Sequence, residues 1–134
     1  MSDEQKKELR LYGIVFFLLA AIDVCHITVG AMFYLEYRTD RALMIAMMAY
    51  KAVIVLIKLY LGEKILRQVR NAKSSGIRLQ IMKAMLIAFV ISLLMDCYCL
   101  LTGDIVYGLI EVCNSGTAFI PLLGCWNAVT NKNA

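Results

Sequence analysis

Four long apolar stretches dominate the pattern of hydrophobic and polar positions along this chain. They cover about 11–35, 42–61, 84–101 and 105–126. A helix needs about 20 predominantly apolar residues to cross a hydrocarbon core roughly 30 Å thick. The pattern therefore predicts four membrane-spanning helices in a single domain, the last of which is the most diluted by polar residues and a proline.

Lysines and arginines are distributed unevenly among the polar segments that flank these stretches. The N-terminal segment has three and the first loop has two, whereas the last loop has none. The central loop, 62–83, holds the largest group, which includes Lys64, Arg67, Arg70, Lys73 and Arg78. Because positive residues are retained on the cytoplasmic side, we predict an all-α integral membrane protein. It is a four-transmembrane-helix bundle with both termini and this basic loop in the cytosol.

The apolar residues of the central loop indicate that the second helix continues into it. Ile65, Leu66 and Val69 are interspersed with the basic residues, until a Ser-Ser-Gly sequence at 74–76 breaks the pattern. Such a segment could lie along anionic lipid headgroups, where each basic residue contributes about 1 kcal/mol. We favour the simpler interpretation, in which these charges only set the topology.

Composition agrees with a membrane protein and argues against several functions. Of the 134 residues, 61% are hydrophobic and 18% are charged, whereas globular chains have roughly 45–50% and about 25%. The net charge of +4 does not indicate nucleic-acid binding, because the basic residues cluster between apolar stretches. The five cysteines form no C-x-x-C pair or zinc-like spacing. We therefore expect that the protein binds no metal and no cofactor. We expect it to lie in the plasma membrane or in an endomembrane.

Ionisable side chains interrupt the apolar stretches. Each one costs about 2.5 to 3.5 kcal/mol at the centre of a membrane helix, so each needs a partner or an aqueous cavity. At a rise of about 1.5 Å per residue, five of these ionisable residues lie roughly 9 to 18 Å below the outer helix ends. Helical spacing places an asparagine on the same helix face as one of them. This polar layer consists of Asp23, His26, Lys51, Asp96, Glu111 and Asn114.

The charges of this layer do not balance. Three carboxylates face one lysine, so we expect at least one carboxyl to be protonated or to share a proton with His26. Lys58 lies nearer the inner boundary, where its long side chain is expected to reach the headgroups. A histidine beside a carboxylate inside a membrane is typical of a proton relay. The alternative, which we favour in so short a chain, is that these groups form ion pairs that fix helix assembly.

Two further features concern contacts and space. Ala42, Ala46 and Ala49 form a small-residue stripe on the second helix, opposite its lysines, which predicts protein on both sides of that helix. Around Glu111 and Asn114, a nearby Pro121 frees a backbone carbonyl, so we expect either a ligand-sized gap or a harmless kink there.

No catalytic motif is present: the sequence has no G-x-x-x-x-G-K-S/T loop, H-E-x-x-H pair or G-x-S-x-G elbow. The first hypothesis is therefore a non-enzymatic accessory, assembly or trafficking subunit that acts through intramembrane helix contacts. Its partners would be the lipid bilayer and another membrane protein or a second copy. The second hypothesis is a small oligomeric proton-coupled transporter or ion-conducting subunit that uses the polar layer as its path.

Overall fold

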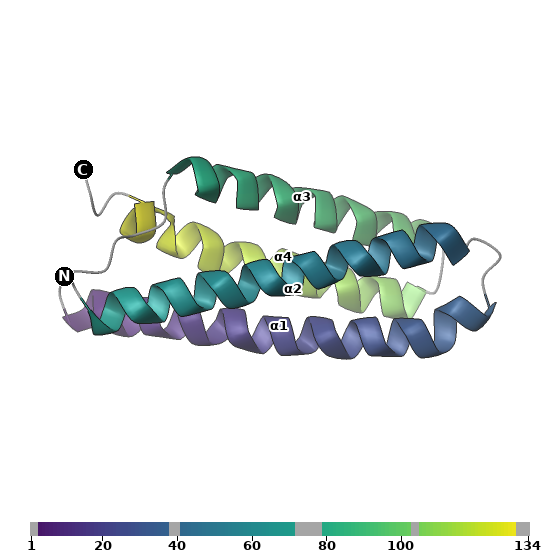
Figure 1. Ribbon diagram of the computed structural model, residues 1–134, viewed down its shortest axis with the longest axis horizontal. Coiled ribbons are helices and arrows are strands. Elements are labelled where there is room, and N and C mark those ends of the chain that lie inside the picture. The colour runs from purple at the N-terminus through teal and green to yellow at the C-terminus, as the bar shows by residue number, and fades with distance from the viewer. Residues whose placement is uncertain (1–2, 38–40, 72–78, 103–104, 131–134) are drawn as a thin grey trace.

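The computed structural model describes residues 3–37, 41–71, 79–102 and 105–130. These residues form four α-helices: α1 (Asp3–Tyr37), α2 (Arg41–Arg70), α3 (Leu79–Thr102) and α4 (Ile105–Thr130). The helices run side by side in alternating directions, as an elongated bundle (Figure 1). The start of α1 and the end of α4 lie at the same end of the bundle as the end of α2 and the start of α3. The predicted all-helical fold is confirmed.

Three of the four helices have the length and composition to cross a membrane. Among the described residues these segments are Asp3–Met32, Ile45–Arg70 and Gln80–Leu101, while the apolar part of α4, Gly108–Gly124, is shorter. Large apolar side chains face outward along all four helices. These properties support a membrane protein. The passage of α4 through the bilayer and the cytosolic location of the termini stay predictions.

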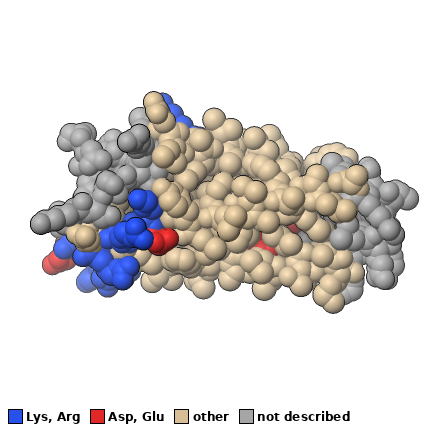
Figure 2. Space-filling view, in the orientation of Figure 1, with Lys and Arg blue, Asp and Glu red and all other residues tan. Residues whose placement is uncertain are grey.

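Helix α2 extends well beyond the apolar stretch that predicts it. It continues past Leu61 to Arg70, because Ile65 and Val69 within the predicted loop are buried against the other helices. The basic residues of this extension lie on its outer side: Arg67 pairs with Glu63 one turn earlier, and basic side chains gather at this end of the molecule (Figure 2). The predicted loop residues Lys73 and Arg78 lie outside the described residues. Lys64 lies over the ring of Tyr60, 6.0 Å from its centre.

The apolar core occupies the half of the bundle that contains the start of α1 and the end of α2. Its fully buried members are spread over all four helices and include Phe16, Leu61, Ile65, Met82 and Leu122. Of the buried ionisable residues, Lys58 lies between the core residues Ile54 and Leu61 of α2, and the others lie further toward the other end of the bundle. Apolar packing at one end and polar pairing further along therefore hold the same four helices together.

Glycines set the closeness of several helix pairs. Gly13 of α1 faces Gly62 of α2, and a Cβ on Gly13 would lie 2.8 Å from Leu66. Gly108 lies so near α3 that a Cβ there would be 2.6 Å from the Leu100 Cα. Small residues at such crossings allow backbones to approach. In contrast, α2 and α3 make few contacts with each other, which leaves a groove between them.

Candidate functional site

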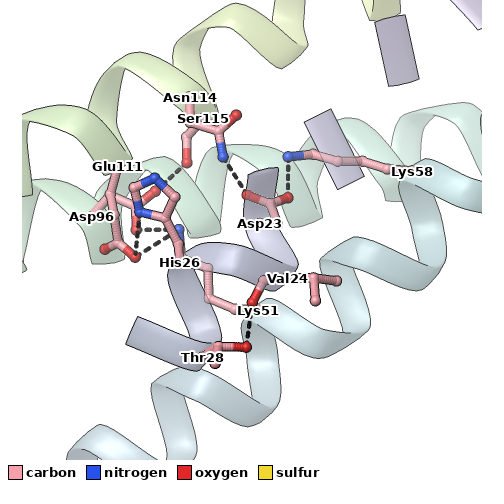
Figure 3. A network of polar contacts seen from close by, with 10 residues as sticks. All are labelled: Asp23, Val24, His26, Thr28, Lys51, Lys58, Asp96, Glu111, Asn114 and Ser115. Atoms are coloured by element: carbon pink, nitrogen blue, oxygen red, sulfur yellow. Dashed lines mark hydrogen bonds and ion pairs between the residues drawn. The ribbon is translucent and has the colours of Figure 1, made fainter. Parts of the chain in front are cut away.

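A buried ionic network connects all four helices, and its first part centres on Asp23 of α1. The Lys58 ammonium of α2 donates a hydrogen bond to Asp23 Oδ2, and the side-chain amide of Asn114 in α4 donates one to Asp23 Oδ1 (Figure 3). Asp23 and Lys58 are each only 2% exposed. A buried carboxylate therefore has a charged partner on one oxygen and a neutral donor on the other.

The second part centres on Asp96 of α3, which is completely buried. The Lys51 Nζ atom of α2 lies 2.5 Å from Asp96 Oδ1, in an ion pair without hydrogen-bond alignment. The hydroxyl of Ser115 in α4 donates a hydrogen bond to the other carboxylate oxygen. Asp96 thus repeats the arrangement at Asp23: one lysine from α2 and one neutral donor from α4.

Glu111 of α4 has longer contacts with cationic groups than either aspartate. Its Oε1 atom lies 3.9 Å from Lys51 Nζ and 4.0 Å from Nδ1 of His26 in α1. Lys51 is therefore shared between Asp96 and Glu111, and the shorter distance is to Asp96. Figure 3 shows the imidazole and the Glu111 carboxyl side by side at one end of the network.

Helical spacing explains why these side chains meet. Lys51 and Lys58 are seven positions apart, which places them on one face of α2 about two turns from each other. Glu111, Asn114 and Ser115 are three and four positions apart, so they share a face of α4. Two carboxylates, from α1 and α3, then fit between these faces, and each lysine contacts one of them directly.

All six residues of the predicted polar layer take part in this network, but the prediction for Lys58 was wrong. The Lys58 side chain is buried against Asp23 and does not reach the inner headgroups. The cause is the true length of α2: Lys58 lies about 18 Å from the helix end at Arg70. The seven-residue spacing from Lys51 was the signal that could have identified it. Ser115 lies one turn after Glu111, on the helix face that helical spacing predicts for it.

A small cavity adjoins the network. It measures 30 Å³ and is bounded by side chains from all four helices: Ile27, Met47, Met48, Lys51, Asp96, Cys99 and Glu111. One water molecule needs at least about 10–15 Å³ of such space together with polar partners, and the lysine and carboxyl groups here are suitable partners. The cavity beside Glu111 is therefore large enough for water but too small for an organic substrate.

The proline of α4 lies within a continuous helix. Pro121 is buried inside a helix that continues to Thr130. The Thr117 hydroxyl donates a hydrogen bond of 2.6 Å to the Cys113 carbonyl oxygen. The proline therefore does not end α4.

The network as a whole contains three carboxyl groups, two lysines and one histidine. With all carboxyls and lysines ionised and His26 neutral, one negative charge remains without a compensating positive charge. Within 3–37, 41–71, 79–102 and 105–130, no group of three or more His, Cys, Asp or Glu side chains is arranged to hold a metal ion. The chemistry available to these groups is ion pairing, hydrogen bonding and proton exchange.

No protein-family model matches the sequence, and neither a curated protein nor a solved structure matches it.

Proposed function

We propose that this chain is a non-enzymatic membrane protein that acts as an accessory, assembly or trafficking subunit. In this proposal it receives a transmembrane helix of another membrane protein in the groove between α2 and α3. The observation that carries the proposal is the contrast between its two kinds of buried surface. The lysines of the ionic network pair with carboxylates inside the chain. The groove, in contrast, is an open apolar surface between helices α2 and α3.

The groove has a volume of 480 Å³. It is lined by Ala46, Met47 and Tyr50 of α2 and by Ile91, Leu94, Met95 and Tyr98 of α3. The Tyr50 hydroxyl already donates a hydrogen bond of 2.7 Å to the Ala88 carbonyl oxygen of α3. An occupant therefore does not need to supply an acceptor to this phenol. An apolar surface of this kind suits a hydrophobic helix.

The small-residue stripe beside the groove favours a helix over other apolar occupants. Ala46 lines the groove, and Ala42 and Ala49, which are also exposed, lie four positions before it and three positions after it on α2. Such spacing lets the backbone of a second helix approach closely, and close packing is a main source of affinity between helices in lipid. A helix also brings its backbone groups already hydrogen-bonded into the membrane. These features fit the second protein contact predicted for this helix.

Site-specific photo-crosslinking tests this proposal. A photoreactive amino acid at Ala46 should give a discrete protein adduct in native membranes, and peptide mapping should locate the adduct in a transmembrane segment of a different protein. The same group at Leu18, an exposed residue of α1, serves as the lipid-facing control and should give no such adduct. A second substitution, Leu94→Trp, should fill the groove and remove the Ala46 adduct.

Three results would contradict the proposal. Ala46 could react only with lipid, or both positions could give the same protein adducts. A third possibility is an adduct with a second copy of the chain, which would replace the proposed partner by self-association.

The second candidate function is a small oligomeric proton-coupled transporter or ion-conducting subunit. The observation that favours it is the 30 Å³ cavity bounded by Lys51, Asp96 and Glu111. Its size suits water and protons rather than an organic substrate. Reconstituted protein that conducts protons across vesicle membranes, with loss of conductance in Glu111→Gln, would favour this candidate over the assembly role.

A further inference from the structure

Basic side chains from two helices gather at the end of the bundle where α1 begins and α2 ends (Figure 2). Lys7 and Arg10 belong to α1, and Lys64, Arg67 and Arg70 belong to α2. Residues three positions apart are neighbours on a helix surface, so each helix presents a row of positive charge. Four of these side chains are exposed and Lys64 is half-buried. We call the five residues the basic cluster.

The packing of α1 against α2 fixes the heights of the two rows relative to each other. The two helices run in opposite directions (Figure 1). A Cβ on Gly13 would lie 2.8 Å from the Leu66 side chain and 3.4 Å from the Gly62 carbonyl oxygen. Gly13 is therefore level with position 64, midway between these two residues of α2. Three residues closer to the end of the bundle, Arg10 is level with Arg67.

A second pair follows in the same register. Lys7 and Arg70 each lie three residues, or about 4.5 Å, further out along their helices. Four cationic side chains from two helices therefore lie within one helical turn along the bundle axis. The Nη2 atom of Arg67 also contacts Glu63, but a guanidinium has five N–H donors and can bind a second anion.

The surface changes from basic to apolar directly inward from the basic cluster. Leu11 and Ile14 are exposed on α1, and Leu59 and Tyr60 are exposed on α2. The Lys64 Nζ atom lies 6.0 Å from the centre of the Tyr60 ring. Tyrosine rings are typical of the headgroup level of a membrane, and outward apolar side chains suit the acyl chains below it. This boundary favours a lipid headgroup over a nucleic acid or an acidic protein segment as the partner of the cluster.

We propose that the basic cluster binds the headgroup of an anionic phospholipid. Arg10 and Arg67 donate hydrogen bonds to its phosphate, a group that guanidinium recognises with two parallel N–H donors. Lys7 and Arg70 add positive charge at the next level. A role in topology alone depends on the number of charges on one side of the membrane, whereas a headgroup site depends on where each charge lies. This surface is separate from the groove between α2 and α3 and does not rest on the function proposed for that groove.

Native mass spectrometry of the full chain in detergent tests this proposal, because it resolves individual bound lipids. The wild type should bind phosphatidylglycerol more than about fivefold more tightly than phosphatidylcholine, because each of several basic residues contributes a factor of about five near an anionic lipid. Arg10→Gln and Arg70→Gln should each lower this preference by about one such factor. Lys83→Gln is the matched control, because it removes one positive charge from an exposed position of α3, outside the basic cluster. It should leave the preference unchanged.

Three results would overturn the proposal. The wild type could bind the two lipids equally, a result that needs no variant to fold. Lys83→Gln could lower the preference as much as Arg10→Gln, which would mean that only the total charge matters. Inorganic phosphate could displace phosphatidylglycerol as effectively as a competing lipid does, which would assign the cluster to a free anion. None of these results depends on the crosslinking from Ala46, so the failure of one proposal is distinguishable from the failure of the other.

Discussion

Removal of one member of the Asp23–Lys58 pair should destabilise the bundle strongly, and removal of both charges should not. Lys58→Met leaves the Asp23 carboxylate with only the Asn114 amide, in a site where both original partners are 2% exposed. Asp23→Asn leaves the Lys58 ammonium without a counter-charge. Loss of one partner of a buried ion pair costs about 3 to 5 kcal/mol, because the other charge stays desolvated and uncompensated.

The double variant Asp23→Asn with Lys58→Met removes both charges. The side-chain amide introduced on α1 would keep an oxygen that accepts from Asn114, and the methionine would fill most of the lysine volume. Replacement of a buried pair by neutral groups of similar size is often close to neutral in stability. We therefore expect a free energy of unfolding within about 1 to 2 kcal/mol of the wild type, and a coupling energy between the two substitutions of at least about 3 kcal/mol.

Reversible unfolding in mixed micelles, titrated with sodium dodecyl sulfate, measures these free energies. The chain has one tryptophan, Trp126, which packs against the apolar core, so its fluorescence reports the docking of α4. The pair Glu63 and Arg67 is the control, because it is exposed on α2 and such pairs contribute only about 0.3 to 0.5 kcal/mol.

Two results would refute the reasoning about this pair. Either single variant could cost less than about 1 kcal/mol, no more than an exposed pair contributes. The double variant could also be as unstable as the sum of the two single variants, which would mean that the charges act independently.

Two further predictions concern helix packing and topology. Gly108→Ala should destabilise the bundle, since its Cβ would lie 2.6 Å from the α3 backbone. Gly116→Ala should be neutral or stabilise the bundle by up to about 1 kcal/mol, because a Cβ at Gly116 would meet no neighbouring atom within 4 Å. Equal effects of the two substitutions in thermal unfolding would contradict this packing. The second prediction concerns three basic residues: Arg67, Arg70 and Lys73. Neutralising them together should disturb the orientation of the chain in the membrane, as measured with glycosylation tags at both termini. An unchanged orientation would count against the role of these charges in topology.

Much of the fold follows from local properties of the sequence, but the outcome differs between elements. The four apolar stretches predicted the four helices, and Ile65 and Val69 correctly indicated that α2 runs into the basic segment. The end of α2 could not be placed from hydropathy alone, because an amphipathic extension has too many charges to count as a membrane span. For this reason the Lys58 side chain was predicted to reach the headgroups, whereas it is buried against Asp23.

The sequence by itself determined that six polar residues must share a buried layer, because helical spacing and the cost of desolvated charge are local quantities. Only the tertiary structure decided that Lys58 pairs with Asp23 and Lys51 with Asp96, since pairing between helices depends on their rotation and axial register. These are set by contacts far apart in the chain, such as Gly13 against Gly62. The groove between α2 and α3 has the same origin: small residues marked one wall, and the loose packing of two helices created the space.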